Sequence, residues 1–184
     1  MKADKKDFNE SNLEFDQGDI KISLSFFDLM RGPREIIELP EGNEDEKLFI
    51  SEFFDFHRSG DFFTHIFEEK ISFNKLFDVK REGARGGHRS YMLTALVSLD
   101  LLRRRDLLQY YSSFENLFDN WATSFSNIDA LNDIIQDGYK EDYYKENRKE
   151  LRPITNILND FVEEMKYIID TMPEVVSVPI NRVN

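Results

Sequence analysis

The segment LLQYYSSFENLFDNWATSF, residues 107–125, carries the strongest structural signal in the chain. Its large apolar residues recur at steps of three and four for about five turns, which is the spacing of an amphipathic helix. They are Leu107, Tyr110, Phe114, Leu117, Trp121 and Phe125. Asp106 stands directly before the segment, where its carboxylate can cap the free amides of the first turn. The sequence therefore predicts a long helix that buries one face.

Related patterns on both sides extend this helical prediction. Pro153 suits the first turn of a helix, and the apolar residues after it define a second long amphipathic helix. They are Ile154, Ile157, Leu158, Phe161, Val162, Met165, Ile168 and Ile169. Residues 91–102 are apolar almost all round, which predicts a central core helix, and residues 43–57, 61–67 and 126–137 predict shorter helices. The expected fold class is mainly α, a bundle of roughly five to seven helices.

A small β element accompanies the helices in this prediction. Residues 20–26, IKISLSF, alternate apolar and polar side chains, the period of a half-buried strand. Turn residues follow at 31–33, and residues 34–39 can return as a partner strand, so we expect a hairpin near residues 20–39. The β-prone segment 175–180 can join this hairpin as a further strand.

The whole chain has the composition of a globular protein with an acidic surface. Its 184 residues are 40% hydrophobic, and 36 acidic against 24 basic residues give a formal net charge of −12. Residues 1–18 are polar and charged, which predicts a mobile acidic arm ahead of a single globular domain, residues 19–184. No cysteine is present, which excludes a disulfide scaffold, a zinc ribbon and a cysteine nucleophile.

The charge pattern also bears on location and partners. The first residues lack the apolar centre of a secretory signal, and the longest uncharged stretch, residues 90–99, is about half of a membrane span. We therefore expect a cytoplasmic protein that does not enter a membrane. A surface of this sign repels phosphate backbones, which disfavours broad nucleic-acid binding and favours a partner with a basic surface.

A basic, glycine-rich loop, KREGARGGHRS at residues 80–90, precedes the predicted core helix. Its glycines can turn backbone amides toward a ligand, and its basic side chains supply donors for an anion. The candidate anion- or partner-binding residues are Lys80, Arg81, Arg85 and Arg89. The spacing fits neither the phosphate loop nor the dinucleotide fingerprint, so the alternative is a solvent loop whose arginines pair with surface carboxylates.

Within this loop, Arg81 and His88 have the spacing of the R-x4–6-H motif and resemble the motif of HEPN ribonucleases. Proteins of that family are helical, and dimerisation brings two such motifs together to cleave RNA without a metal. The resemblance implies that Arg81 stabilises the phosphate and that His88 either takes part in proton transfer or orients the 2′-hydroxyl. A ribonuclease of this class is one alternative to a binding protein.

A third group, His57, Asp61 and His65, has spacing that suits metal ligation. On an unbroken helix these residues would lie one turn apart on the same face, but Gly60 interrupts the run. Their alternative roles are a histidine at a helix C-terminus, a cap and a residue at the edge of the core.

Three tyrosines in the charged segment 139–150 have no evident place in a core. They are Tyr139, Tyr143 and Tyr144. Tyrosine is enriched at protein interfaces, so this segment is a candidate interaction surface.

These observations favour an acidic cytoplasmic interaction or regulatory module that binds another macromolecule, with a protein as the expected partner, and that needs no cofactor or metal. No GxSxG or HExxH motif occurs, so hydrolase and zincin chemistry has no support in the sequence. The first alternative is the HEPN-like ribonuclease. The second is a nucleic-acid mimic, or an inhibitor of a nucleic-acid-binding enzyme, with carboxylates in place of phosphates. The oligomeric state stays open.

Overall fold

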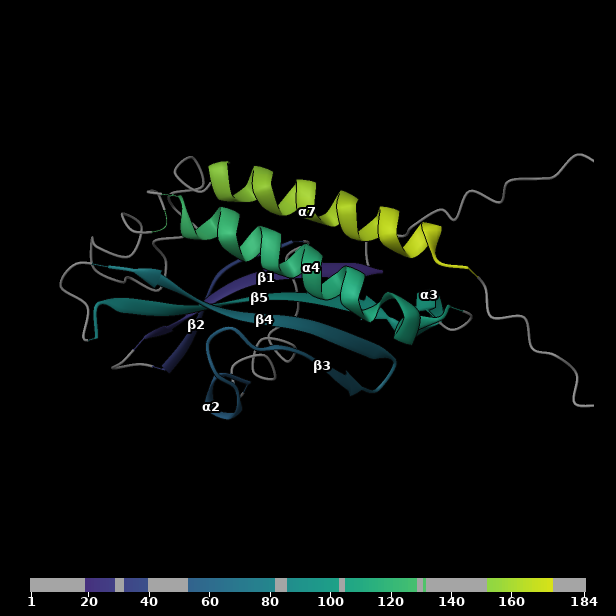
Figure 1. Cartoon of the computed structure of the whole chain (residues 1–184), viewed down its shortest axis with the longest axis horizontal. Coiled ribbons are helices and arrows are strands. Elements are labelled where there is room, and N and C mark those ends of the chain that lie inside the picture. Colours follow the sequence, from purple (N-terminus) through teal and green to yellow (C-terminus); the bar gives the residue numbers. More distant parts are fainter. Residues whose placement is uncertain are drawn as a thin grey trace, which may run out of the picture.

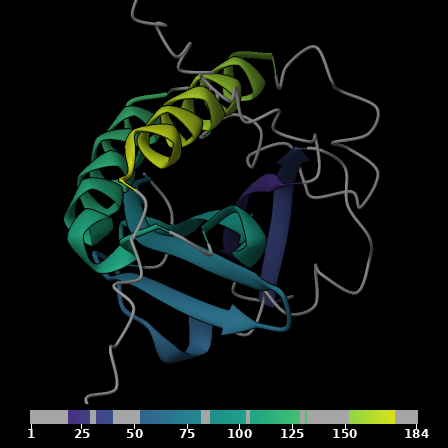
Figure 2. The same ribbon diagram turned by 90° about the vertical axis from the view of Figure 1, so that its right-hand side faces the viewer.

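A five-stranded antiparallel sheet forms the centre of the structure, and two long helices cover one of its faces (Figure 1, Figure 2). The computed structural model describes residues 19–28, 32–39, 53–81, 86–102, 105–128, 131 and 152–173. The strands are β1 (Ile20–Asp28), β2 (Gly32–Leu39), β3 (Phe62–Phe67), β4 (Lys70–Lys80) and β5 (His88–Ser98). The helices are α2 (Phe53–Phe56), α3 (Leu99–Leu102), α4 (Leu107–Ser126) and α7 (Arg152–Thr171).

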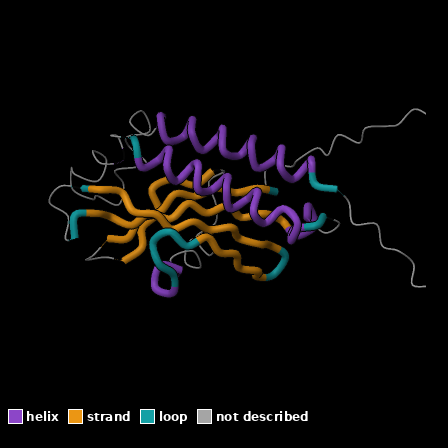
Figure 3. Tube along the Cα trace, viewed as in Figure 1, coloured by secondary structure: helices purple, strands orange, loops and turns teal. Residues whose placement is uncertain are grey.

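The strands lie in the order β2-β1-β5-β4-β3, and each neighbouring pair is antiparallel. Figure 3 shows the strands as one layer beside the two long helices. Three of the four pairings join strands that follow one another in the chain. The fourth joins β1 to β5, which places β5 at the centre of the sheet. The longest ladder runs between β4 and β5, from Lys70 opposite Ser98 to Lys80 opposite His88.

The main hydrophobic core lies between the sheet and the two long helices. Alternate residues of the central strands point to this side because side chains alternate along a strand. Examples with almost no exposure are Ile22, Leu24, Phe73, Leu93 and Phe161. The ring centroid of Phe114 of α4 lies 4.6 Å from that of Phe73, so α4 packs directly on β4.

The helices α4 and α7 run antiparallel to each other over this core (Figure 1). The hydroxyl of Tyr110, near the start of α4, donates a hydrogen bond to the carbonyl oxygen of Thr171 at the end of α7 (3.4 Å). Farther along, the indole nitrogen of Trp121 donates to Glu164 (3.0 Å), and its ring meets the edge of Phe161. These contacts join the two helices into one layer.

The opposite face of the sheet combines a small apolar cluster with a buried polar row. The cluster contains Phe53, Phe63, Leu76 and Met92. In the polar row, Thr94 donates to the Asn74 side-chain oxygen (3.0 Å), and the Asn74 amide donates to the Ser72 hydroxyl (2.9 Å). All three are buried, and these hydrogen bonds offset the cost of removing their polar groups from water.

The expectation of a mainly α helical bundle is wrong, because residues 62–67, 70–80 and 88–98 form strands. The segment expected to be the central core helix, residues 91–102, is mostly β5. From Tyr91 to Val97 this strand is buried on both faces. A short continuous apolar run of this kind has no periodicity that separates a buried strand from a buried helix.

Other expectations agree with the structure. The hairpin near residues 20–39 is confirmed as β1 and β2, with a bulge between Leu24 and Ser25. The two long amphipathic helices are confirmed as α4 and α7. The arm at residues 1–18 and the candidate strand at 175–180 lie outside the described residues. Among the helices of the described part, none is both long enough and apolar enough to cross a membrane.

Candidate functional site

The described part of the basic segment, residues 80–81 and 86–90, lies at the end of the β4–β5 hairpin. Lys80 closes β4, Arg81 follows it, and Arg89 lies near the start of β5. Gly86 (φ +88°) and Gly87 (φ +76°) adopt the left-handed backbone that glycine tolerates best. The amide of Arg81 donates to the carbonyl oxygen of Gly87 (2.9 Å), so the backbone of the hairpin stays paired just beyond the strands.

The hairpin divides its charged side chains between the two faces of the sheet. Lys80 pairs with His88, on the face opposite the long helices, whereas Val79 pairs with Arg89 on the helix-covered face. Arg81 follows Val79 by two residues and so lies on the side of Arg89. Arg81 and His88 are therefore not brought together. The HEPN resemblance also implies a helical fold, and this expectation is wrong because the chain contains a five-stranded sheet.

His88 instead joins a polar group at the hairpin end of β4 and β5. Its Nε2 lies 3.5 Å from a carboxylate oxygen of Asp78, and its Nδ1 lies 2.9 Å from the carbonyl oxygen of Gly86. The hydroxyl of Ser90 donates to the other oxygen of Asp78 (2.7 Å). A nucleophilic serine needs the histidine as its base, whereas here both groups contact the aspartate. The arrangement therefore fixes the hairpin and does not activate the serine.

On the helix-covered face, the charges of Arg81 and Arg89 act on the fully buried Tyr91. Burial raises the pKa of Tyr91 to about 12, and the positive charges of Arg89 and Arg81 oppose this shift. The guanidinium of Arg89 lies 5.3 Å from the ring centroid of Phe26, in cation–π contact. Arg34 of β2 stands opposite Phe26 in the ladder and adds a third arginine. We call Arg34, Arg81, Arg89 and Tyr91 the arginine cluster.

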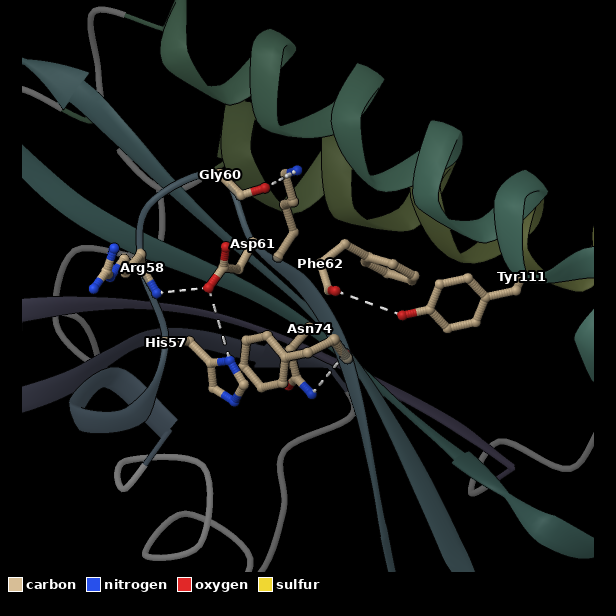
Figure 4. Close-up of polar contacts among 9 residues, drawn as sticks. His57, Arg58, Gly60, Asp61, Phe62, Asn74 and Tyr111 are labelled. Atoms are coloured by element: carbon tan, nitrogen blue, oxygen red, sulfur yellow. Dashed lines mark hydrogen bonds and ion pairs between the residues drawn. The ribbon is translucent and has the colours of Figure 1, made fainter.

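His57, Asp61 and His65 lie around the beginning of β3, not along one helix. Figure 4 shows His57 beside Asp61, with Nδ1 3.9 Å from a carboxylate oxygen that also accepts from the amide of Arg58 (2.8 Å). The ring of His57 stacks on Phe63 with centroids 3.4 Å apart. In the part of the chain that the structure describes, no three acidic or histidine side chains lie close enough to hold a metal ion.

Four other residues named from the sequence lie outside the described residues, and their proposed roles stay predictions. They are Arg85, Tyr139, Tyr143 and Tyr144.

The strand β3 offers an open edge that the sequence did not indicate. Within the described residues, β3 pairs with β4 alone. A two-residue turn joins Phe67 to its partner Lys70, and a closing pair of this type is hydrogen-bonded. The alternation that follows from it directs the backbone groups of Phe62, Thr64 and Ile66 away from β4, toward the outer edge.

The carbonyl oxygen of Phe62 shows this outward direction. It accepts a hydrogen bond from the hydroxyl of Tyr111 on α4 (3.5 Å), as Figure 4 shows. The two rings also meet edge to face, with centroids 5.1 Å apart. The side of α4 that carries Tyr111 therefore lies along the β3 edge.

This side of α4 is partly apolar and partly acidic. Residues three and four apart share one side of a helix, which places Leu108, Glu115 and Asp119 with Tyr111. The side chain of Asp119 reaches across to Lys75 of β4 (2.5 Å), which confirms the direction of this side. Leu108 is 88% exposed.

Ile66 completes the apolar part from the strand. It lies two residues beyond Thr64 on the same face as Phe62, and it is 61% exposed. We call the surface formed by Thr64, Ile66, Leu108, Tyr111 and Glu115 the β3 edge site. It combines unpaired strand backbone, exposed apolar side chains and a carboxylate.

Comparisons with known proteins identify the fold. No family model matches the chain, and no curated protein matches it. Among solved structures, the K. lactis Lst4 longin domain is similar, with a TM-score of 0.55 and 13% sequence identity. The match covers 82% of this chain and 99% of that domain. The chain therefore has a longin-like α/β fold, and at this identity the likeness extends to the fold alone.

Proposed function

We propose that this chain is a cytoplasmic protein-binding module that takes an extended segment of its partner as a sixth strand along β3. The observation that carries the proposal is the contrast between the two edges of the sheet. Natural sheets protect their edge strands from pairing with proline, charged side chains and bulges. One edge of this sheet has these features, and the other does not.

The protected edge is β2. It contains Pro33, the charged residues Arg34, Glu35 and Glu38, and a bulge in its ladder with β1. The strand β3 reads FFTHIF, with no proline, no acidic residue and no lysine or arginine, and its register with β4 is continuous. A regular, mostly apolar edge is a template for another strand.

The charge around the β3 edge site indicates the chemistry of the partner. Glu115 lies on the adjoining side of α4, and Glu68 and Glu69 form the exposed turn at the end of β3. The chain as a whole has a net charge of −12. A partner segment that alternates apolar and basic residues would therefore place apolar side chains on Ile66 and Leu108 and basic ones near these carboxylates.

The fold supports a binding role in general terms. Longin domains typically mediate protein–protein interactions. The fold therefore supports a binding role, whereas the proposed surface and the proposed partner are argued from the residues of this chain. The nucleic-acid-mimic hypothesis rests on net charge, and it stays a prediction.

The first test uses an extended peptide of alternating isoleucine and lysine, with a glutamate-for-lysine peptide as its control. We expect the lysine peptide to bind and to slow hydrogen exchange of the Thr64 and Ile66 amides. Thr64→Pro removes an outward amide that the added strand needs, so it should weaken binding roughly tenfold or more. Thr64→Val keeps that amide and is the matched control.

Several outcomes would contradict this proposal. Equal binding of both peptides would contradict the proposed preference for a basic partner. Equal binding by the proline and valine variants would show that the partner does not pair with the outer edge of β3. If Thr64→Pro does not fold, Ile66→Lys provides the test, because its charge repels the lysine peptide. Sedimentation that shows a dimer which Thr64→Pro dissociates would assign the edge to a second copy of this chain.

A further inference from the structure

The arginine cluster lies at one end of the sheet, on the face that the long helices cover. The ladder aligns Arg34, Phe26 and Tyr91 in one row across three strands. The next row toward the hairpin contains Arg89 opposite Val79. Arg81 follows two residues later on the same side. Four polar residues from β2, β5 and the end of β4, which are well separated in the sequence, therefore lie in adjoining rows on one face of the sheet.

Two polar atoms in this cluster are buried without a hydrogen-bond partner among the described residues. They are Nη1 of Arg81 and the hydroxyl of Tyr91. Tyr91 is 0% exposed, and a buried polar atom that lacks a partner costs free energy. Buried groups of this kind call for an explanation, of which a bound ion is one. The guanidinium nitrogen can only donate and the phenol hydroxyl can donate as well, so one acceptor ligand would satisfy both.

The charges near these donors indicate what kind of acceptor fits. The charges that act on the Tyr91 hydroxyl come from Arg89 and Arg81, and both are positive. Arg34 adds a further positive charge in the adjoining row. Guanidinium groups bind tetrahedral oxyanions through paired hydrogen bonds, and a phenol can add one more donor. Several positive charges also favour a dianion over a single carboxylate.

We propose that the arginine cluster binds a small phosphate-type oxyanion, with Arg81 and the Tyr91 hydroxyl as direct donors and with Arg89 and Arg34 as supporting charges. Arg81 and Arg89 are half-buried as whole residues, so the cluster borders the surface at the hairpin end of the sheet. Tyr91 is held in the sheet between Phe26 and Phe77, which fixes one of the two donors before the ion arrives. This site is separate from the β3 edge site, and it does not depend on the proposed function.

Lys80 provides a matched control for this proposal. It is the neighbour of Arg81 in the chain and carries the same charge, but it is exposed and pairs with His88 on the opposite face. A non-specific attraction of phosphate to the basic hairpin would depend on Lys80 and Arg81 alike. A specific site at the arginine cluster depends on Arg81 and not on Lys80.

The experiment measures the melting temperature and the binding of inorganic phosphate by calorimetry, with chloride balancing the ionic strength. We expect phosphate to bind the unaltered chain and to raise its melting temperature. Arg81→Gln should weaken binding roughly tenfold or more, and Tyr91→Phe roughly threefold to tenfold, because each removes one donor. Lys80→Gln should bind as the unaltered chain does. Tyr91→Phe keeps the ring in the core, so it tests the site even if Arg81→Gln fails to fold.

Three results would overturn the proposal. The first is no binding of phosphate, the second is equal loss in Lys80→Gln and Arg81→Gln, and the third is full binding by Tyr91→Phe. Glycerol phosphate, used in the same way, separates two sources of the anion. Binding of inorganic phosphate alone assigns the site to the free ion, and binding of both assigns it to phosphate esters as well.

Discussion

The surroundings of Tyr91 change the pKa of its hydroxyl. Its ring packs between Phe26 and Phe77, with centroids 6.4 and 5.7 Å away, and its hydroxyl is buried. Burial raises its pKa to about 12, well above the ordinary value of 10.0, and the charges of Arg89 and Arg81 oppose this shift. The neutral phenol is therefore favoured in the folded state.

This shift predicts how stability depends on alkaline pH. The folded pKa lies above the unfolded one, so the contribution of Tyr91 is complete below pH 10 and is lost as pH rises toward 12. The loss should be about 1 kcal/mol per pH unit across that interval. Urea unfolding of the unaltered chain and of Tyr91→Phe at several pH values measures it as a difference. Parallel pH profiles for the two proteins would show that the hydroxyl is not buried.

At the residue scale, the sequence revealed part of the arginine cluster. Arg81 and Arg89 were candidates because they share one basic segment with glycines. Arg34 is not a candidate from the sequence, because its segment carries no comparable basic, glycine-rich pattern. Only the pairing of β2 with β1 places it opposite Phe26. The opposite orientations of Arg81 and His88 also depend on strand alternation, which a helical interpretation of the segment could not supply.

At the scale of elements, Lys75 ties the sheet to the helix above it. Its ammonium group contacts Asp119 of α4 (2.5 Å) and donates to the carbonyl oxygen of Gly60 (2.6 Å), while the residue is 8% exposed. A lysine on the core side of a strand is costly unless it is paired. The pair therefore fixes where α4 sits on β4.

Removing one partner of this pair should cost more than removing the charge altogether. Asp119→Ala leaves the ammonium group buried without its carboxylate and should destabilise the fold by about 1–3 kcal/mol. Lys75→Met keeps the apolar stem and should stay within about 1 kcal/mol of the unaltered chain. Chemical denaturation of both single variants and the double variant measures the coupling. If Asp119→Ala costs as much in the Lys75→Met variant as in the unaltered chain, the two side chains do not interact.

The elements that sequence patterns identified are those with one buried face. The helices α4 and α7 and the strand β1 each alternate apolar and polar residues with a clear period, and all three were predicted. The strand β5 is a nearly continuous apolar run with no clear period, whereas β4 alternates apolar and polar residues except at Lys75 and Leu76, where the two types exchange places. The spacing of the four bulky apolar residues of β3 also fits a helix, which is why the sequence predicts a helix there. That error also concealed the β3 edge site, because an edge exists only once the strand is recognised.

At the scale of the whole molecule, the net charge of −12 acts on stability and on binding in opposite directions. Repulsion among carboxylates destabilises the compact state, and salt screens it. The melting temperature should therefore rise by about 2–4 °C as chloride increases from about 0.02 to about 0.3 M. The affinity for the basic peptide should fall over the same range. Chloride is the suitable salt, because sulfate and phosphate are ligands for the proposed oxyanion site.

A result in which salt lowers the melting temperature would contradict this expectation. It would mean that attractive ion pairs such as Lys75 with Asp119 outweigh repulsion across the surface.

The order of the strands also sets the order in which the molecule can be assembled during synthesis. The hairpin of β1 and β2 is made before the other strands of the sheet, yet the strand that borders β1 on its other side, β5, is made after β2, β3 and β4. The edge of β1 that pairs with β5 therefore has no native partner until β5 has been made. The covering helices α4 and α7 come later still. The pairing of β1 with β5 is therefore a non-local contact, and we expect the sheet to close only after β5 has been made.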